Sequence, residues 1–491
     1  MRTPVRTLTI LATATTLGLV PLACGNDKGS GTADDSGIAS AAKCPVGAFE
    51  KASGATIIKV WHSYVGKTKL ALDDLAAQYN ASQDKVVVEL EAQGNSYTEL
   101  RRKFEGAIPT KDLPAITIAE DTETQFMADS GVVLPATACQ KADRDAARQT
   151  DDILPAVKAA YTLDDVQYPA SMNVSTVVLY YNKGDFAAAG LDPEQPPTTL
   201  AEVRTAAEKL KAAGVSDKPF VMKMDPWFVE QWTSGAGQTL VNKDNGRSGT
   251  ATEGTLENPA TNGAMQWIAD MNTAGLLNAI PGTDGQINHY LAMLPSGSSS
   301  MLIETSAAIT TINGVLQGSV DPADLGLPEG APIEIDVTGL DIGVGLNPGL
   351  TEPGKGQIGG GAWYITNTGS DEVQSAAWDF VKFFNSTPSQ VTWTQDGGYL
   401  PILDSAKNDP TLQADWQTST RGKWLATSYG GITTLDPKFP GALIGPYDRF
   451  RQLLRKGLED VVFTGIPPKS AIATANDGVT TELADYEKNR F

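Results

Sequence analysis

Short apolar stretches alternate with helical stretches near the start of the body of this chain, and this alternation limits the folds that it can adopt. Thr56–Trp61, Val86–Leu90 and Ala115–Ala119 predict strands. Apolar residues at helical spacing in Lys67–Ser82 and Ser96–Gly106 predict helices between them. Such alternation is typical of a parallel sheet covered by helices. Because these sheets bind ligands beyond the carboxyl ends of their strands, we expect functional residues directly after each strand.

Later stretches indicate that the same α/β pattern continues. Ser171–Lys183 is a β-branched and aromatic run that predicts a strand, and Asp185–Ala189 predicts a short helix after it. Ser375–Phe384 and Pro446–Val462 carry apolar residues at helical spacing. No internal repeat is visible in the sequence. We therefore expect two or three α/β domains and a helical C-terminal part.

The first residues have the composition of an export signal. Arg2 and Arg6 make the start basic, and Leu8–Leu22 is an apolar stretch of about 15 residues, too short for a membrane span. Residues 1–23 are therefore predicted to be a signal peptide. Cys24 directly after it resembles the lipidated cysteine of a bacterial lipoprotein, although Pro21 and Leu22 depart from the usual pattern. A lipid anchor at Cys24 is the expectation, and plain secretion is the alternative.

The segment after Cys24 is rich in Gly, Ser, Asp and Ala, and residues 24–49 are predicted to be a flexible tether. The chain has three cysteines, so that lipidation of Cys24 leaves Cys44 and Cys139 to form a disulfide outside the cytoplasm. On the chain-entropy model, a crosslink across such a long loop stabilises the fold by roughly 4 to 5 kcal/mol. Two unrelated buried thiols are the alternative.

Composition excludes several classes of function. The chain has 491 residues, of which 41% are hydrophobic, and a formal net charge of −20, which disfavours nucleic acid as a partner. Only His62 and His289 are available for histidine chemistry, and no CxxC or Cys/His spacing predicts a metal site. We therefore expect neither a cofactor nor a metal.

Six sequence motifs are similar to those of one family. They are WHSY at 61–64, GNSY at 94–97, STVVLYYNK at 175–183, AAAGLDPEQPPTTLAEV at 187–203, IGGGAWYI at 358–365 and GGYLPI at 397–402. From Thr56 to the C-terminus the chain resembles the family 1 extracellular solute-binding proteins of ABC importers. Within that family it is most similar to the binders of glycerol 3-phosphate and glycerophosphodiesters.

The resemblance implies an α/β fold of type II with two lobes and a ligand cleft between them. It places hinge crossovers near residues 169–177, 293–300 and 359–362. Lobe 1 would then comprise residues 50–172 and 297–357. Lobe 2 would comprise residues 173–296 and 358–491, including the helical C-terminus.

The resemblance also implies which residues bind the ligand. They are Tyr97, Glu120, Ser175, Trp227, Ser306, Gly360, Gly361 and Tyr399. Aromatic faces suit the C–H surface of a polyol, while hydroxyls, a carboxylate and backbone amides suit its oxygens. Close backbone approach at the glycines is consistent with this role.

Each of these assignments has a structural alternative. The two tyrosines are also suited to capping turns, and Glu120 to a solvated acidic helix start. Ser175 is also suited to a purely structural place in its strand. One of Trp227 and Trp232 is expected in the core, with Trp227 the better cleft candidate, and Tyr64 is a further candidate for the cleft.

Two departures from the family bear on the ligand. Leu443 aligns with the family arginine that binds phosphate, so that a phosphate ligand would need another arginine, such as Arg449 or Arg451, to reach the site. Met224 stands where some members have a second tryptophan. These departures favour a neutral sugar or a larger glycerol derivative over glycerol 3-phosphate.

The sequence thus predicts the extracytoplasmic substrate-binding component of an ABC importer rather than an enzyme. Its expected partners are a carbohydrate or polyol ligand, the permease and, through the lipid anchor, the membrane, and it is expected to be a monomer on the outer face of the cell. One alternative is a secreted carbohydrate-active hydrolase that uses Glu120 and Asp121. Their adjacency on an extended chain would point them to opposite sides. A structural surface protein is the other alternative.

Overall fold

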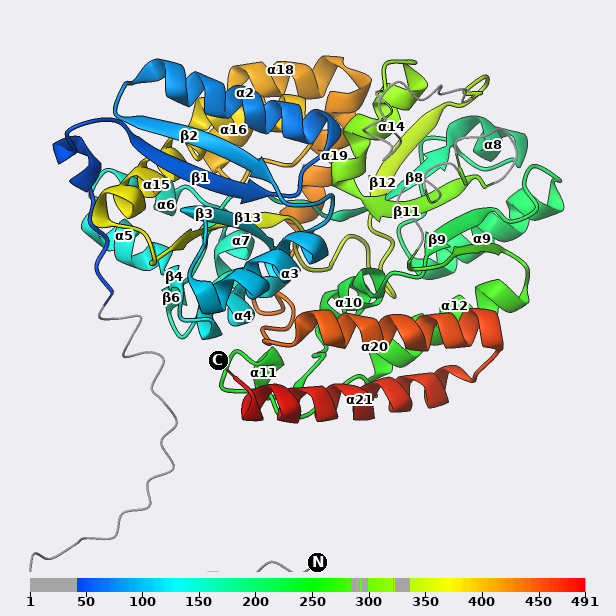
Figure 1. Cartoon of the computed structure of the whole chain (residues 1–491). Helices are drawn as coiled ribbons and strands as arrows, with labels where there is room; N and C mark the ends of the chain where they lie inside the picture. The colour runs from blue at the N-terminus through cyan, green and yellow to red at the C-terminus, as the bar shows by residue number, and fades with distance from the viewer. Residues whose placement is uncertain are drawn as a thin grey trace, which may run out of the picture.

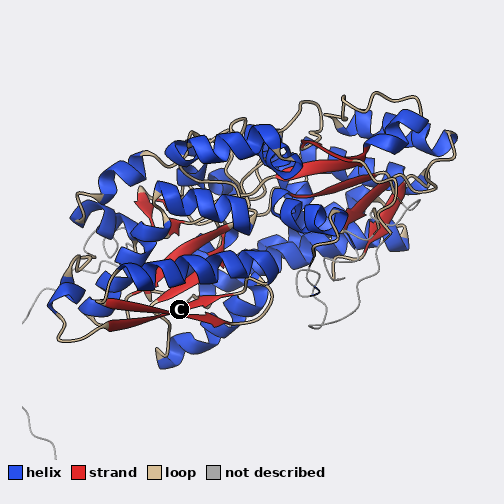
Figure 2. Ribbon diagram, turned by 90° about the horizontal axis from the view of Figure 1, so that it is seen from above, coloured by secondary structure: helices blue, strands red, loops and turns tan. Residues whose placement is uncertain are grey.

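The computed structural model describes residues 42–283, 299–320 and 336–490, with residues 289, 292–293 and 322 described singly. The predicted signal peptide, Cys24 and most of the predicted tether lie outside the described residues. Two sheets, each covered by helices, lie side by side in an elongated body (Figure 1, Figure 2). The predicted α/β class and two-lobed architecture are confirmed.

The first lobe is built on a sheet with the strand order β2-β1-β3-β13-β4, in which β7 also pairs with β13. Its strands are β1 (Thr56–His62), β2 (Val86–Ala92), β3 (Ile116–Glu120), β4 (Val133–Leu134), β7 (Ala170–Ser171) and β13 (Gly361–Thr366). Strand β1 pairs in parallel with β2 and β3, as the alternation of strands and helices predicts. Strand β13 returns from far along the chain and pairs antiparallel with β3.

The second lobe is built on a sheet with the strand order β10-β9-β11-β8-β12. Its strands are β8 (Val177–Asn182), β9 (Phe220–Lys223), β10 (Leu277–Ile280), β11 (Met301–Thr305) and β12 (Ile342–Leu346). All six residues of β8 are buried, which agrees with its β-branched and aromatic sequence. Strands β11 and β12 pair antiparallel with the two sides of β8. A separate hairpin joins β5 (Thr162–Leu163) to β6 (Val166–Gln167).

These pairings correct the predicted domain boundaries. Residues 297–357 were assigned to lobe 1, but β11 and β12 belong to the second sheet. The segment 358–491 was assigned to lobe 2, but β13 and α15 (Asp371–Phe384) belong to the first lobe. The predicted crossover at 293–300 is also wrong, because β10 and β11 lie in the same sheet. An apolar strand sequence does not reveal which of two sheets it joins, since both sheets offer a buried position.

Helices of 4 to 21 residues cover both sheets. Up to the end of the second sheet they are α2 (Gly66–Ser82), α3 (Tyr97–Ala107), α4 (Thr124–Asp129), α5 (Ala136–Ala142), α6 (Ala146–Asp151), α7 (Pro155–Ala160), α8 (Lys183–Ala188), α9 (Leu200–Ala212), α10 (Pro226–Gly235), α11 (Asn242–Asn245), α12 (Pro259–Thr273) and α14 (Ile309–Leu316). After β13 they are α15, α16 (Thr387–Gly397), α17 (Asp404–Lys407), α18 (Pro410–Thr418), α19 (Thr420–Ile432), α20 (Tyr447–Glu459) and α21 (Pro468–Lys488).

The helices after β13 are divided between the lobes. Helix α15 packs on β1 and β13, and α16 packs on α2, all in the first lobe. Helix α19 packs on β12, while α20 and α21 pack against each other and against α10 and α12 of the second lobe (Figure 1). The helix predicted at 446–462 ends earlier, at Glu459, and continues as one π-helical turn.

Two of the predicted crossovers lie side by side and bond to each other. The amide of Ser175 donates to the carbonyl of Gly359 at 2.8 Å, and the amide of Gly359 donates back to the carbonyl of Ser175 at 2.9 Å. Next to this bridge, the Gly361 amide donates to Oδ1 of Asn173 at 2.7 Å. The lobes are therefore connected by two crossovers joined in an isolated antiparallel bridge, a place where small changes in backbone dihedrals can rotate one lobe against the other.

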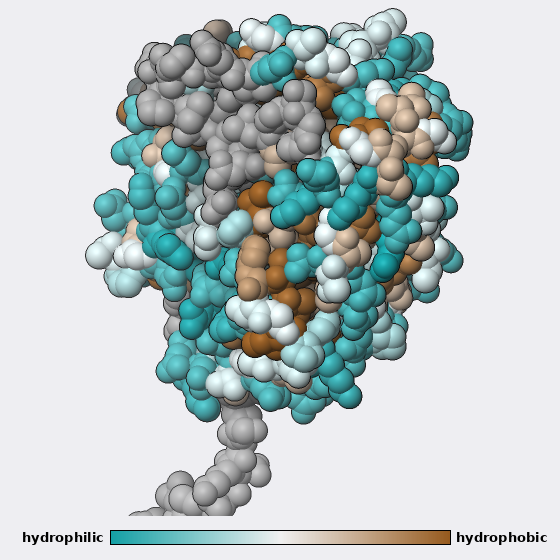
Figure 3. Space-filling view, turned by 90° about the vertical axis from the view of Figure 1, so that its right-hand side faces the viewer, coloured by the Kyte–Doolittle hydropathy of each residue, from teal (hydrophilic) through white to brown (hydrophobic). Residues whose placement is uncertain are grey.

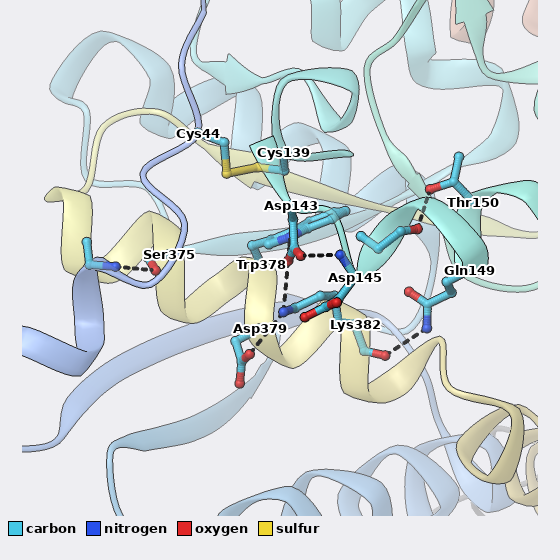
Figure 4. A network of polar contacts seen from close by, with 12 residues as sticks. Cys44, Cys139, Asp143, Asp145, Gln149, Thr150, Ser375, Trp378, Asp379 and Lys382 are labelled. Atoms are coloured by element: carbon cyan, nitrogen blue, oxygen red, sulfur yellow. Dashed lines mark hydrogen bonds and ion pairs between the residues drawn. A yellow bond between two sulfur atoms is a disulfide. The ribbon is translucent and has the colours of Figure 1, made fainter. Parts of the chain in front are cut away.

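The start of the described chain is fixed to the first lobe. Cys44 and Cys139 form a disulfide, and beside it the Asp143 carboxylate accepts from Nε1 of Trp378 at 3.0 Å and pairs with Lys382 at 2.8 Å (Figure 4). The short 3-10 helix Ala48–Lys51 packs on α15. The predicted tether of residues 24–49 is therefore too long, because residues from Cys44 onward belong to the folded body.

Hydrophilic side chains cover much of the face of the molecule that is seen in Figure 3. In the space-filling view, hydrophilic side chains surround a narrower band of apolar ones (Figure 3). Among the described residues, no helix combines the length and the apolar character needed to cross a membrane.

Candidate functional site

The carboxyl edge of the first sheet carries a group of tyrosines. Tyr64 follows β1, Tyr97 is the first residue of α3, and Tyr399 lies in the turn after α16. The hydroxyls of Tyr64 and Tyr97 are 3.0 Å apart, and the ring centroids of Tyr64 and Tyr399 are 6.0 Å apart. Tyr97 and Tyr399 are half-buried, whereas Tyr64 is buried. We call these three residues the tyrosine wall.

Local sequence places the tyrosine wall. Ser96 caps α3 by accepting a hydrogen bond from the amide of Glu99 at 3.2 Å, which fixes the direction of Tyr97. A Cβ atom on Gly361 would lie 2.7 Å from the hydroxyl of Tyr97 and 3.1 Å from that of Tyr64. Only glycine at this position therefore lets the crossover at 359–362 pass beneath both hydroxyls. Tyr97 and Tyr399 are held in one cluster, not in isolated turns.

Trp227 lies opposite the crossover glycines, on α10 of the second lobe. Asp225 caps α10 by accepting from the amide of Trp227 at 3.0 Å. A Cβ atom on Gly359 would lie 2.8 Å from the Trp227 ring, so this ring packs directly on the crossover. Trp227 is half-buried, whereas Trp232 is fully buried and donates its Nε1–H to the carbonyl of Pro348. Of the two tryptophans, Trp232 is thus the core residue.

A charged network joins the two lobes at the base of the cleft. Arg451 on α20 donates from Nε and Nη2 to the two carboxylate oxygens of Glu230, both at 2.9 Å. Its Nη1 donates to Oε1 of Glu120 at 2.8 Å. Glu120 ends β3 of the first lobe, while Glu230 and Arg451 belong to the second. The Arg451–Glu120 ion pair therefore spans the cleft. We call Glu230, Arg451 and Tyr447 the charged wall.

Two carboxyl groups that follow β3 have raised pKa values. Burial and the charge of Glu120 raise the pKa of Asp121 well above its ordinary value. Burial raises the pKa of Glu123 to about 7, although its ion pair with Arg101 at 2.8 Å opposes this shift. Glu120 is not a solvated helix start, because its carboxylate bonds to Arg451.

A cavity of about 340 Å³ opens between Tyr97 and the charged wall and draws its lining from both lobes. Tyr64, Tyr399 and Trp227 are not among the lining residues. The first lobe contributes Tyr97, Glu120 and the start of α3, and the second contributes Lys223, Asp225, Tyr447, Arg451 and Arg455. A concave site with a few convergent polar groups is typical of small-molecule binding. Within the described part of the chain, no group of three His, Cys, Asp or Glu side chains is arranged for a metal ion.

Some candidates lie behind the cavity rather than on it. Ser306 is fully buried, and its Oγ accepts from the amide of Thr176 at 3.2 Å. Ser175 is buried in the crossover pair, and Gly360 has a positive φ of 127° beside Asn173. These residues hold the crossover together, and the cavity lining does not include them.

The structure shows which of the positions 443, 449 and 451 faces the cleft. Leu443 is buried in the loop before α20, and Arg449 pairs with Glu482 on the outer side of that helix. Arg451 alone of the three faces Glu120. Sequence reasoning did not identify Glu230 and Tyr447. Glu230 lies three residues after Trp227, and Tyr447 lies four residues before Arg451. Each spacing places the two residues on one helix face, and this pattern would have identified Glu230 and Tyr447.

Two α/β lobes joined by paired crossovers, with a polar cavity between them, define a two-lobed binding protein. Residues 74–420 match the family described as bacterial extracellular solute-binding protein. This match covers more than half of the chain, and the chain belongs to that family.

Known relatives and structures share this organisation. The chain is 25% identical over 447 residues to the sn-glycerol-3-phosphate-binding periplasmic protein UgpB of Escherichia coli K12, covering 89% of this chain and 95% of the relative. The fold is similar to that of UgpB from Mycobacterium tuberculosis in complex with glycerophosphocholine, with a TM-score of 0.69, 17% identity and coverage of 88% of this chain and 100% of that one. It is also similar to the cyclic alpha-maltosyl-1,6-maltose binding protein from Arthrobacter globiformis, with a TM-score of 0.68, 20% identity and coverage of 88% and 100%.

Proposed function

We propose that this protein captures a carbohydrate or a glycerol derivative outside the cytoplasm and delivers it to the permease of an ABC importer. The cavity between the lobes is the single observation that carries the proposal, because a ligand held there contacts both lobes at once. Such contacts favour the closed arrangement of the lobes and make closure dependent on ligand. The protein carries out no chemistry on the ligand and acts as a monomer.

The chemistry of the two walls supports a polyol ligand. Tyr97 of the tyrosine wall lines the cavity and offers its hydroxyl and ring, and Trp227 of the opposite lobe packs on the crossover. Arg451 and Glu120 supply a donor and an acceptor to ligand oxygens. Relatives named as binders of glycerol 3-phosphate, glycerophosphocholine and a maltose derivative all take oxygen-rich ligands. The ligand class proposed for this chain is therefore a sugar, a glycerophosphodiester or glycerol 3-phosphate.

Residues 1–23 direct export, and Cys24 carries the lipid that anchors the protein to the outer face of the cell membrane. The support for this is the basic start, the apolar stretch and the cysteine directly after it. Because Cys44 and Cys139 are bonded to each other, Cys24 has no cysteine partner within the chain. Mass spectrometry of the mature N-terminus tests the anchor. A lipid-modified Cys24 supports it, and an unmodified N-terminus beyond Cys24 rules it out.

Isothermal titration of the purified protein with sn-glycerol 3-phosphate, glycerophosphocholine and maltose tests the ligand class. We expect micromolar or tighter binding of at least one compound, with compaction in small-angle scattering. Absence of binding by all three and by a wider sugar panel contradicts the proposal. Release of chromophore from aryl glycosides would instead support the hydrolase alternative.

A further inference from the structure

Glu230 is the member of the charged wall that does not line the cavity. Its side chain is fully buried on α10, one helical turn after Trp227. Its carboxylate holds the Nε and Nη2 atoms of Arg451 in a two-point bond, with both distances at 2.9 Å. The other terminal nitrogen of the guanidinium, Nη1, donates across the cleft to Oε1 of Glu120 at 2.8 Å.

The position of Glu230 is itself fixed from several elements. Its Oε2 also accepts from the hydroxyl of Tyr447 at 3.1 Å and from Nε2 of Gln357 at 3.3 Å. The guanidinium carbon of Arg451 lies 5.2 Å from the Tyr447 ring centroid, so the ring limits movement of the guanidinium on a further side. Helix α10, helix α20 and the segment before the crossover at 359–362 thus meet at the carboxylate of Glu230.

A buried ion pair of this kind contributes little net stability, because desolvation offsets the attraction between the charges. Its best-attested use is to fix one geometry. Here the fixed geometry is that of a cleft residue, since Arg451 lines the cavity and Glu230 does not.

We propose that Glu230 is a positioning residue of the ligand site, which holds Arg451 so that Nη1 is presented to an oxygen acceptor in the cleft. This inference rests on the proposed function and deepens it. In the free protein the acceptor is the carboxylate of Glu120, and in the complex a ligand oxygen takes or shares that place. A phosphate oxygen and a hydroxyl oxygen both fit this chemistry.

A double-mutant cycle in the full-length free protein tests the positioning without any ligand. Glu120 and Glu230 are coupled through Arg451, so the effect of Glu120→Gln on the unfolding equilibrium constant should shrink at least fivefold when Glu230→Gln is also present. Asp143→Asn is the matched control, because Asp143 is a buried carboxylate with its own lysine partner on the far side of the first lobe. Its effect should add to that of Glu120→Gln. A cycle that is additive for Glu230 as well overturns the proposal.

Titration of the same variants with sn-glycerol 3-phosphate, glycerophosphocholine and maltose tests the consequence for binding. Glu230→Gln should lower the affinity for the probe that the wild type binds by at least tenfold. Glu230→Asp should lower this affinity less, and Asp143→Asn should change it less than twofold. Binding of maltose alone assigns a hydroxyl oxygen as the acceptor, because glycerol 3-phosphate and glycerophosphocholine carry hydroxyls as well as phosphate. Reduced stability with unchanged affinity would mean a purely structural role and overturn the proposal. A wild type that binds none of the probes contradicts the proposed ligand class, while the cycle in the free protein still decides the role of Glu230.

Discussion

The two sides of the cleft are built on different principles. The tyrosine wall of the first lobe consists of neutral side chains, and the hydroxyl of Tyr97 meets the hydroxyl of Tyr64. The charged wall of the second lobe is a buried ion pair in which Glu230, fully buried, holds Arg451. The first wall can lose one hydroxyl and keep its packing. The second cannot lose one charge without leaving the other buried and unpaired.

This difference separates residues that serve the ligand from residues that serve both the ligand and the fold. On the tyrosine wall, a substitution should act on affinity and leave stability almost unchanged. On the charged wall, the same class of substitution should act on both.

Arg451→Ala should destabilise the protein by about 3 to 5 kcal/mol, because it leaves the carboxylate of Glu230 buried without its partner. It should also abolish binding. Chemical denaturation measures the first effect. Arg449→Ala on the same helix is the control, and it should cost less than about 1 kcal/mol because its ion pair with Glu482 is exposed. Equal effects of the two substitutions would remove the distinction between the walls.

Trp227→Ala should weaken ligand binding by about 2 kcal/mol or more, because we propose that the half-buried ring, which packs on Gly359 at the crossover, stacks on the ligand. Titration calorimetry measures the change. Trp232→Phe serves as the comparison, since Trp232 belongs to the core and its substitution should act on stability. Unchanged affinity in Trp227→Ala would assign Trp227 to the core as well.

The Glu123 carboxyl should make stability fall as the pH rises. Its folded pKa of about 7 lies above its ordinary value of 4.5, so its contribution is fully present below about pH 4.5 and is lost as the pH rises through about 7. The slope for one proton is at most about 1.4 kcal/mol per pH unit. Denaturation of the wild type and of Glu123→Gln across this range isolates the contribution. Parallel curves for the two proteins would exclude it.

Tyr97→Phe should weaken binding by about 1 kcal/mol, the typical net value of one hydrogen bond, and leave the unfolding midpoint nearly unchanged. The hydroxyl of Tyr64 keeps its bond from Nδ2 of Asn173 at 2.8 Å in this variant. Calorimetry and thermal unfolding measure the two quantities. A large loss of stability with little change in affinity would show that the tyrosine wall is structural.

Local patterns predicted the elements of the fold well. The strands at 56–61, 86–90 and 115–119 and the helices between them were expected within a few residues of their observed limits, because period and length distinguish them. The assignment of strands to sheets was not predictable in this way. β13 joins the first sheet from more than 200 residues beyond β3, and nothing in its apolar sequence reveals its neighbours.

The candidate site shows the same limit. Tyr97, Glu120 and Tyr399 follow strands or turns whose place in the family is marked by motifs. The structure brings Tyr97 and Glu120 to the cavity, while Tyr399 packs on Tyr64 and is not among the lining residues. Glu230 and Arg451 come from helices 221 positions apart, and only their contact in space reveals their role. Ser306 was a predicted ligand residue on a weaker match, and it lies behind the cavity, where its Oγ accepts from the amide of Thr176 at the crossover.

Hydrogen exchange of the wild-type protein, with and without the tightest-binding probe, tests most directly the claim that both walls hold the ligand. We predict slower exchange both at the end of β3 with the start of α3 and in α10 with the start of α20. Protection confined to one lobe, or protection away from the cleft, would contradict the account.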